Sequence, residues 1–301
     1  MCLIAFAINA SARWPLVIAA NRDEFLDRPC LPLARWTSAS GQEVISGRDL
    51  HAGGTWLGMT SGGRMAFLTN VREGRPQAAP RSRGELVMRW LETDCEAGDF
   101  ISALEKDGAA YGGFNLVLGD FQRDTWTWVT NKADAFRATA NSRWHAQPLQ
   151  AGVYGLSNAA LDTPWPKTVE LKQTLATVLT ASSDTHQPEA LLAPLWAALD
   201  NRQRAPLANL PATGVPLVTE EALSSAFVDF PENAYGTRCS TVLLASAVEP
   251  GKGRGERRWN LKVEERTHAR ADAQATAHAS SHPAAHSLAS SYQMTWLQAG
   301  I

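Results

Sequence analysis

The chain has 301 residues, of which 45% are hydrophobic, so it is long enough to bury a sizeable core in one large domain or two small ones. Its 28 basic residues nearly cancel its 30 acidic ones, and the formal net charge of -2 excludes the strongly basic field typical of proteins that bind nucleic acid or anionic membranes. We therefore expect a small-molecule or apolar ligand rather than either of these partners.

The four cysteines include no Cys-x-x-Cys pair and have no closely spaced histidine, so no zinc site is predicted. They are Cys2, Cys30, Cys95 and Cys239. Reduced thiols without such a framework indicate a cytoplasmic protein. No apolar run approaches the roughly 20 residues that a membrane-spanning helix needs, so we expect no integral membrane segment.

The first predicted elements are two strands of a hairpin. Apolar runs at residues 2–8 and 16–20 are separated by a turn-like segment, and the second run leads directly into Asn21-Arg22-Asp23-Glu24. The end of the second strand of an antiparallel pair lies beside the start of the first, so Cys2 is expected beside Arg22 and Asp23. A secretory signal is the alternative for the first run, but its short length and the absence of a basic stretch before it favour a strand.

The position of Cys2 suggests a nucleophile. Met1 precedes a small residue, so its removal by an aminopeptidase is predicted, leaving Cys2 with both a thiol and a free α-amine. An α-amine titrates near ~8 and a thiol near ~8.5, so each can serve the other as a base at neutral pH. N-terminal nucleophile hydrolases work in this way. The alternative is that Cys2 is a small buried hydrophobe at the start of a strand.

The next segment combines short strands with flexible turns. Strands are predicted at 43–45 and 64–69, with the pair Gly53-Gly54 forming a turn between them. The same pair can alternatively bring backbone donors close to a ligand. The polar, arginine-rich segment 70–83 is predicted to be a solvated loop, and its arginines are alternatively placed to hold a carboxylate or a phosphate of a substrate.

After this loop, apolar residues recur at the spacing of an α-helix. A capping box at Ser82-Arg83-Gly84-Glu85 opens the first helix. Pro164 follows Thr163 at the first position of a later one. Helices are predicted at 82–96, 99–108, 163–179 and 191–199. Their aliphatic and Trp stripes are interpreted as core rather than as a cofactor site.

Strands alternate with these helices and continue to the end of the chain. They are predicted at 113–120, 125–130, 152–157, 235–244, 259–267 and 292–297. Between the last two, residues 268–290 are rich in Ala, Ser and His and are interpreted as a low-complexity, disordered loop. His268, His278, His282 and His286 lie in it and can bind metal adventitiously, but no core would fix them, so no functional metal site is predicted.

Five motifs occur in the order found in one family. They are Asn21-Arg22-Asp23-Glu24, Gly53-Gly54-Thr55-Trp56-Leu57-Gly58, Leu156-Ser157-Asn158, Leu161-Asp162-Thr163-Pro164-Trp165-Pro166-Lys167 and Tyr235-Gly236-Thr237-Arg238. Over about residues 1–246 the chain resembles the NRDE family, which includes the transport and Golgi organisation protein 2 homologues. The resemblance implies an N-terminal-nucleophile-hydrolase-like fold with Cys2 in the nucleophile position, and a link to haem and lipid handling.

The resemblance also extends to related cysteine acylases such as penicillin V acylases and bile-salt hydrolases. In these an Asn from a middle strand helps to hold the oxyanion, which makes Asn115 or Asn158 a candidate here, with a structural turn as the alternative for each. A late Arg lies near their nucleophile, which makes Arg238 a candidate, with a structural ion pair as the alternative. The acylases place their Arg and Asp three residues apart, whereas Arg22 and Asp23 are adjacent and so point to opposite faces of a regular strand.

The order of strands and helices predicts an α+β fold, a four-layer αββα sandwich of two antiparallel sheets flanked by helices. Residues 1–301 are predicted to form one domain, with the low-complexity loop at about 268–290 inserted near its end.

The predicted function is hydrolysis of an amide bond in a small or acylated substrate. Cys2 would attack and its α-amine would move the proton, while Asp23 orients that amine. Arg22 or Arg238 would tune the charge, and Asn21 belongs to the candidate site as a member of the same tetrad. No cofactor is required for this reaction. The alternative is a non-enzymatic carrier or trafficking factor that holds haem or an acyl lipid in the same cleft.

Overall fold

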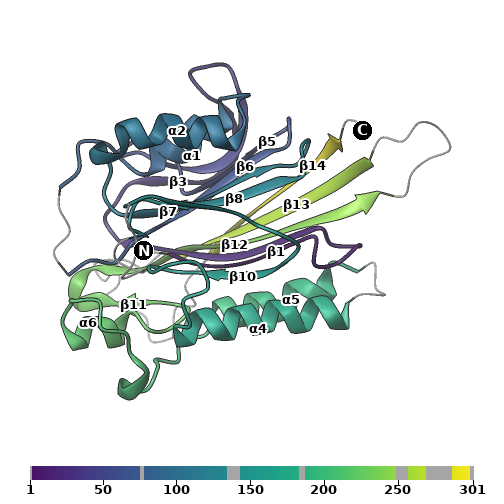
Figure 1. The fold of residues 1–301 in the computed structure, drawn as a ribbon. Coiled ribbons are helices and arrows are strands. Elements are labelled where there is room, and N and C mark those ends of the chain that lie inside the picture. Colours follow the sequence, from purple (N-terminus) through teal and green to yellow (C-terminus); the bar gives the residue numbers. More distant parts are fainter. Residues whose placement is uncertain are drawn as a thin grey trace, which may run out of the picture.

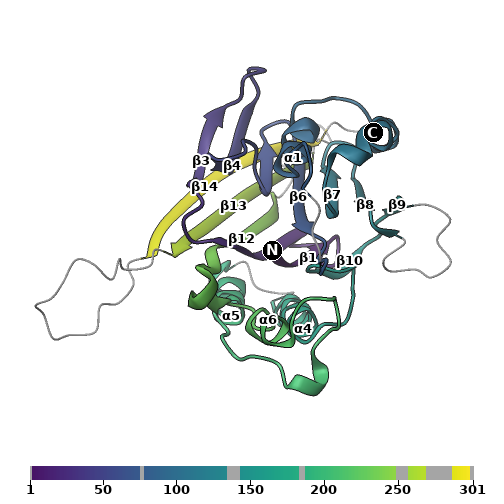
Figure 2. The same cartoon turned by 90° about the vertical axis from the view of Figure 1, so that its left-hand side faces the viewer.

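The computed structural model describes residues 2–74, 78–133, 143–182, 187–248, 257–268 and 287–298. Two seven-stranded antiparallel sheets face each other, and helices cover the outer face of each (Figures 1 and 2). The predicted four-layer αββα sandwich is therefore confirmed. Among the helices within these ranges, none combines the length and the apolar character needed to cross a membrane.

The first sheet contains the predicted hairpin near its centre. Its strand order is β10 (Gly152–Leu156), β1 (Cys2–Ile8), β2 (Leu16–Phe25), β12 (Tyr235–Val248), β13 (Arg257–His268) and β14 (Ser287–Gln298), with β11 (Asp229–Phe230) paired to β12. The second sheet runs in sequence order. Its strands are β3 (Cys30–Thr37), β4 (Glu43–Asp49), β5 (Leu57–Thr60), β6 (Arg64–Asn70), β7 (Phe114–Asp120), β8 (Thr125–Thr130) and β9 (His145–Pro148).

The helices fall into two groups, one on each sheet. The α-helices are α1 (Gly84–Leu91), α2 (Ala97–Asp107), α4 (Pro166–Ala181), α5 (Glu189–Leu199) and α6 (Leu217–Ala222), and short 3-10 turns occupy Gly108–Ala110, Leu207–Asn209 and Pro231–Asn233. Helix α1 contacts β5, β6 and β7, whereas α4 and α5 contact β1, β2, β10 and β12. Figure 1 shows α1 and α2 above one sheet and α4 and α5 below the other.

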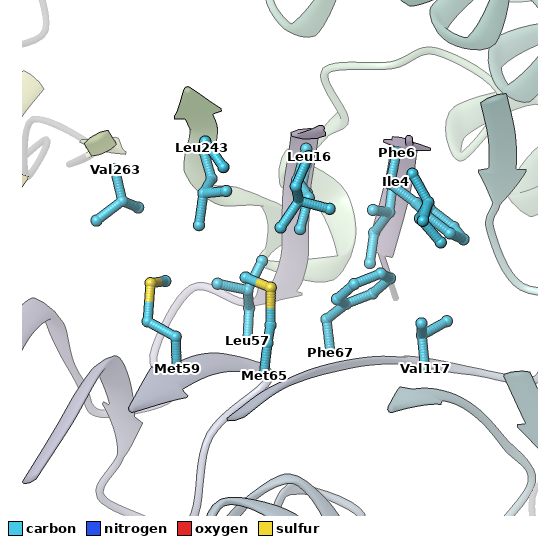
Figure 3. Close-up of a cluster of buried hydrophobic side chains, with 14 of the residues drawn as sticks. Ile4, Phe6, Leu16, Leu57, Met59, Met65, Phe67, Val117, Leu243 and Val263 are labelled. Atoms are coloured by element: carbon cyan, nitrogen blue, oxygen red, sulfur yellow. The ribbon is translucent and has the colours of Figure 1, made fainter. Parts of the chain in front are cut away.

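The alternation of side chains along β1 and β2 separates two cores. Ile4, Phe6 and Ile18 point between the sheets, where Phe6 meets Phe67 of β6 with ring centroids 5.0 Å apart. Figure 3 shows the side chains of the two sheets pointing toward one another in this layer. Residues such as Leu3 point the other way and pack with α4 and α5. Both faces of β1 are buried, which explains why its sequence is continuously apolar.

The helix boundaries differ from the predicted ones at the capping residues. Helix α1 begins at Gly84 with Arg83 as its N-cap, and Ser82 contributes by accepting a hydrogen bond from the Gly84 N–H at 3.3 Å. The first helix ends at Leu91 rather than at 96. Helix α4 begins at Pro166, because Trp165 is still extended.

The terminal strands are longer than predicted. His268, assigned above to the low-complexity loop, lies in β13, where its Nε2 is 2.8 Å from the Ser240 hydroxyl. Residues 287–290 of the predicted loop belong to β14. The remainder, 269–286, lies outside the described residues together with His278, His282 and His286.

The pair Gly53-Gly54 forms the predicted turn and also makes a close contact. Both residues have positive φ, +70° and +80°. A Cβ on Gly54 would lie 2.4 Å from the carbonyl carbon of Gly84, whereas a Cβ on Gly53 would have no atom within 4 Å. The Thr55 N–H donates to the Gly84 carbonyl at 3.2 Å. This turn therefore holds the first residue of α1 against the segment before β5.

These two glycines allow steric crowding to be separated from backbone strain. Because both have positive φ, we expect Gly53→Ala to lower the free energy of unfolding by about 1 kcal/mol. Gly54→Ala should lower it by about 3 kcal/mol, since overpacking adds to the strain. Urea denaturation measures both values. Gly98→Ala in α2, where a Cβ meets nothing within 4 Å, is the control and should not destabilise the protein. Equal losses for Gly53→Ala and Gly54→Ala would contradict the close contact.

Candidate functional site

The register of three neighbouring strands brings Cys2 and Arg22 together. Cys2 lies directly opposite Arg22 in the β1–β2 pair, and Arg22 lies opposite Cys239 in the β2–β12 pair. Residues directly opposite each other share a face of the sheet, so all three side chains point toward the second sheet. The predicted position of Cys2 beside Arg22 is confirmed.

Cys2 opens onto a cavity of about 540 Å³ at this end of the sandwich. Its wall is built from both sheets and from the segment that starts α1. Seven lining side chains carry a formal charge, namely Arg22, Asp23, Glu24, Arg28, Asp49, Arg81 and Arg83. Trp56, Leu68 and Asn70 contribute the wall from the second sheet. The cavity is thus mainly polar, with the cysteine in its wall.

Arg22 is held in place by an aromatic platform. Its guanidinium carbon lies 4.2 Å from the centre of the Trp56 ring, a cation–π contact. The Trp56 ring also packs against Gly47, where a Cβ would lie 2.2 Å from Trp56 Cη2 and displace the ring. Only 6% of Arg22 is exposed, and its Nη1 has no hydrogen-bond partner among the residues that the structure describes. Glu24 is its nearest carboxylate, at 3.8 Å.

Asp23 points to the opposite face of the first sheet, as the adjacency of Arg22 and Asp23 predicts. The Thr237 hydroxyl donates to its Oδ1 at 2.7 Å. The Tyr235 hydroxyl donates to its backbone carbonyl at 2.8 Å. Burial raises the pKa of the Asp23 carboxyl, and the positive charge of Lys167 is the largest influence in the other direction. Asp23 nevertheless forms part of the cavity wall, so it connects the cavity with the layer behind the sheet.

That layer contains a buried charge network that the sequence did not reveal. The Lys167 ammonium donates to the Leu223 carbonyl at 2.7 Å, and burial lowers its pKa to about 8. Arg72 forms a buried ion pair with Glu220 of α6. A buried charge is tolerated when it is paired and hydrogen-bonded, which is the condition met here. The only sequence signal was that Lys167 and Thr237 stand in the fourth and fifth motifs.

Asn21 has a structural position away from the cavity. Its amide donates to the carbonyls of Leu199 and Ala226, both at 2.8 Å. Because Asn21 lies opposite Leu3 rather than Cys2, it points toward the helices. The structure therefore does not bring Asn21 together with Cys2.

The asparagines predicted to hold the oxyanion donate elsewhere. The Asn115 amide donates to the Ala159 carbonyl at 2.8 Å and to the Thr69 hydroxyl at 3.1 Å. The Asn158 amide donates to the Asn70 carbonyl at 2.9 Å. Neither belongs to the described cavity wall, so the structural alternative fits both. The Asn on the cavity wall is Asn70, which sequence analysis placed at the end of a strand without a role.

Arg238 also acts away from Cys2. It lies at an irregularity in β12 where the pairing to β2 shifts between Thr237 and Cys239. Its Nη1 donates to the carbonyls of Phe25 and Leu26, each at 2.8 Å. Arg238 thus fixes the turn after β2, through carbonyl groups rather than through the ion pair considered as its structural alternative.

The burial of Cys2 affects the protonation of its thiol. Burial raises the pKa of the Cys2 thiol, although Arg22 acts in the opposite direction. The sulfur is therefore a thiol that needs a base, rather than a thiolate already formed.

The fold and the site define the chain as an αββα sandwich protein with a cysteine at the start of a central strand and a charged cavity beside it. The family model described as Transport and Golgi organisation 2 matches residues 1–252, and the chain belongs to this family. It is 35% identical over 257 residues to the Transport and Golgi organization protein 2 homolog of Bos taurus, covering 82% of this chain and 89% of that protein. It is 33% identical over 257 residues to the homolog of Homo sapiens, with 82% and 89% covered. The predicted family resemblance is confirmed.

The chain is also similar to a solved variant of conjugated bile acid hydrolase from Clostridium perfringens. The identity is 8%, the TM-score is 0.44, and the match covers 84% of this chain and 90% of that one. A likeness this remote carries no conclusion about the activity of the chain.

The pKa of Lys167 leads to a pH-dependent prediction. Between about 8 and the ordinary 10.5, the unfolded chain binds more protons at this lysine than the folded protein does. Lys167 therefore makes the free energy of unfolding rise with pH in this window, by at most about 1.4 kcal/mol per pH unit. Lys167→Met should remove that rise.

Urea denaturation of wild type and Lys167→Met at several pH values between about 7.5 and 9.5 tests this. All other ionisable groups are common to the two proteins, so the difference between the two curves isolates Lys167. A difference that stays constant across the window would show that Lys167 has an ordinary pKa.

Proposed function

We propose that the protein hydrolyses amide bonds with Cys2 as its nucleophile. The observation that carries the proposal is the position of Cys2, beside Arg22 and in the wall of a cavity of about 540 Å³. A buried structural cysteine would need neither a cavity nor a neighbouring cation. The proposal includes removal of Met1, which gives Cys2 a free α-amine.

In the proposed reaction the α-amine of Cys2 takes the thiol proton as the sulfur attacks the substrate carbonyl carbon. The C–N bond then breaks, the ammonium returns the proton to the departing nitrogen, and the acyl group stays on the sulfur as a thioester. Water attacks the thioester with the same amine as base, which releases the acid and restores the thiol. The raised pKa of Cys2 is compatible with this order, because the proton leaves only as the sulfur attacks.

The neighbouring residues have separate proposed roles. Asp23 orients the amine, and its own position is fixed by the Thr237 hydroxyl at 2.7 Å. Asn70 on the cavity wall is the proposed oxyanion donor, in place of Asn115 and Asn158, whose amides are engaged by other groups. No cofactor enters these steps.

The lining of the Cys2 cavity favours the hydrolase proposal over the carrier alternative. Sites for small organic ligands are usually lined by apolar and aromatic side chains. The Cys2 cavity has seven charged side chains in its wall, so its lining does not fit a haem macrocycle or an acyl chain.

A two-part experiment tests the proposed reaction. Intact-mass measurement first establishes whether Met1 is absent, and p-nitrophenyl acetate is then used as the acylating probe. We expect an acetyl group on Cys2 that turns over, and no such adduct in Cys2→Ala. Cys95→Ala is the matched control, since Cys95 is a half-buried thiol outside the cavity wall, and it should behave as wild type.

A variant with one extra residue ahead of Cys2 tests the amine. Its general base would be an amide, so hydrolysis of the adduct should slow by about 100-fold or more while the protein still folds. The proposal is wrong if the four cysteines acylate at equal rates and the blocked terminus changes no rate.

A further inference from the structure

The arginines in the wall of the Cys2 cavity outnumber its carboxylates. Arg28 is paired with Asp49 at 2.8 Å. Arg81 is paired with Glu85, on the first turn of α1. Arg83 has no carboxylate within ion-pair distance in the described part of the chain, and its Nη1 makes a single long hydrogen bond, 3.3 Å, to the Gly113 carbonyl. It is a half-buried cation facing the cavity without an anion.

Arg22 adds a second unsatisfied donor to the same cavity. Its side chain is more than nine-tenths buried and its Nη1 lacks a partner among the described residues. The stacking of its guanidinium on Trp56 restricts where these donors can point. A buried charged donor without an acceptor is destabilising, so an acceptor supplied by a ligand is favoured at this point.

The first turn of α1 reinforces the charge. Ser82, Arg83 and Gly84, which lead into the helix, line the cavity. The N-terminus of a helix has a partial positive charge and favours an anion in front of it. The turn at Gly54 holds this end of α1 in place. Arg83 is thus the N-cap of a helix whose first residue lies in the wall of the cavity.

We infer that the Cys2 cavity binds an oxyanion of its ligand, a carboxylate or a phosphate, between Arg83, Arg22 and the first turn of α1. As a description of the substrate of Cys2, this rests on the proposed function, whereas the binding itself does not require Cys2 to react. The fork of an arginine matches both kinds of anion, which is why the two share one site.

Other groups in the wall decide where the anion lies. Glu24 is 3.8 Å from both Arg22 and Arg28, so its carboxylate excludes an anion from that side. Gly112 faces Arg83, and a Cβ there would come within 3.1 Å of Arg83 Nη1. The anion therefore lies on the α1 side, and burial, which lowers the pKa of Arg83, is the cost that a bound anion would offset.

The binding experiment uses Cys2→Ala protein, so that no reaction can occur, at low ionic strength. Inorganic phosphate and acetate are titrated separately by calorimetry, and the tighter of the two identifies the source of the oxyanion. Arg83→Gln should weaken that binding about tenfold or more, because a hydrogen bond to a charged group contributes about 1.5–3 kcal/mol. Arg35→Gln removes one charge from an exposed arginine of β3 and should leave binding within twofold.

Folding is checked for each variant by urea denaturation. If Arg83→Gln fails to fold, Arg83→Lys keeps the charge and the aliphatic stem but loses the fork, and we expect it to bind at least threefold more weakly than wild type. The inference is overturned if neither ion binds, or if Arg35→Gln weakens binding as much as Arg83→Gln does. Binding that depends on Arg83 without acyl transfer in the wild type would overturn the proposed hydrolysis and leave this inference standing.

Discussion

The register between β1 and β2 is the constraint on which the candidate site depends. Side chains alternate along a strand, so the pairing of Cys2 with Arg22 sends both into the space between the sheets, while Asn21 and Asp23 go to the helical side. A slip of β2 by one residue against β1 would move Arg22 to the helical side and Asn21 and Asp23 into the space between the sheets. Arg22 would then lie away from Trp56, and Asn21 would leave two buried carbonyls without donors. The apolar cores on both faces prevent this slip.

The charges behind the sheet show how the fold tolerates a buried acid next to Cys2. Asp23, Lys167, Arg72 and Glu220 are all buried, and an isolated charge in such surroundings would cost several kcal/mol. Each has a partner or a hydrogen bond, and the partners come from segments far apart in the sequence. The two motif residues among them, Asp23 and Lys167, are therefore accounted for by the compensation of buried charge.

Much of the fold could be predicted from the sequence, because apolar periodicity and turn residues act locally. The hairpin, the Gly53-Gly54 turn and the position of Cys2 beside Arg22 follow from alternation and antiparallel pairing. The roles of Asn115, Asn158 and Arg238 could not be derived in this way. Each of these side chains donates to a carbonyl that only the tertiary structure brings within reach.

The same limit applies to the cavity wall. Arg83 belongs to a segment whose composition fits a solvated loop as well as a binding surface, and only the docking of α1 against Gly54 decides between them. Trp56 was visible as part of a motif, but its function as a platform depends on the missing side chain of Gly47, one strand away. Strand and helix ends were missed by several residues where a cap or an extended residue, such as Trp165, overrides the local pattern.

Strand β2 pairs with β1, which precedes it in the sequence, and with β12, which is synthesised much later. This order has a consequence for the folding of the chain during synthesis. β1 precedes β2 by a short turn, whereas Tyr235 of β12 is 212 residues away from the Asp23 carbonyl that it binds. At about 5–20 residues per second, the ribosome completes the first hairpin some tens of seconds before it reaches β12. Until then β2 has one open edge, which can pair with any other extended chain. In a nascent or truncated chain Cys2 and Arg22 would therefore be exposed, and Asp23 would lack its hydrogen bond from Thr237. Such a chain would depend on a chaperone or on rapid completion to avoid aggregation.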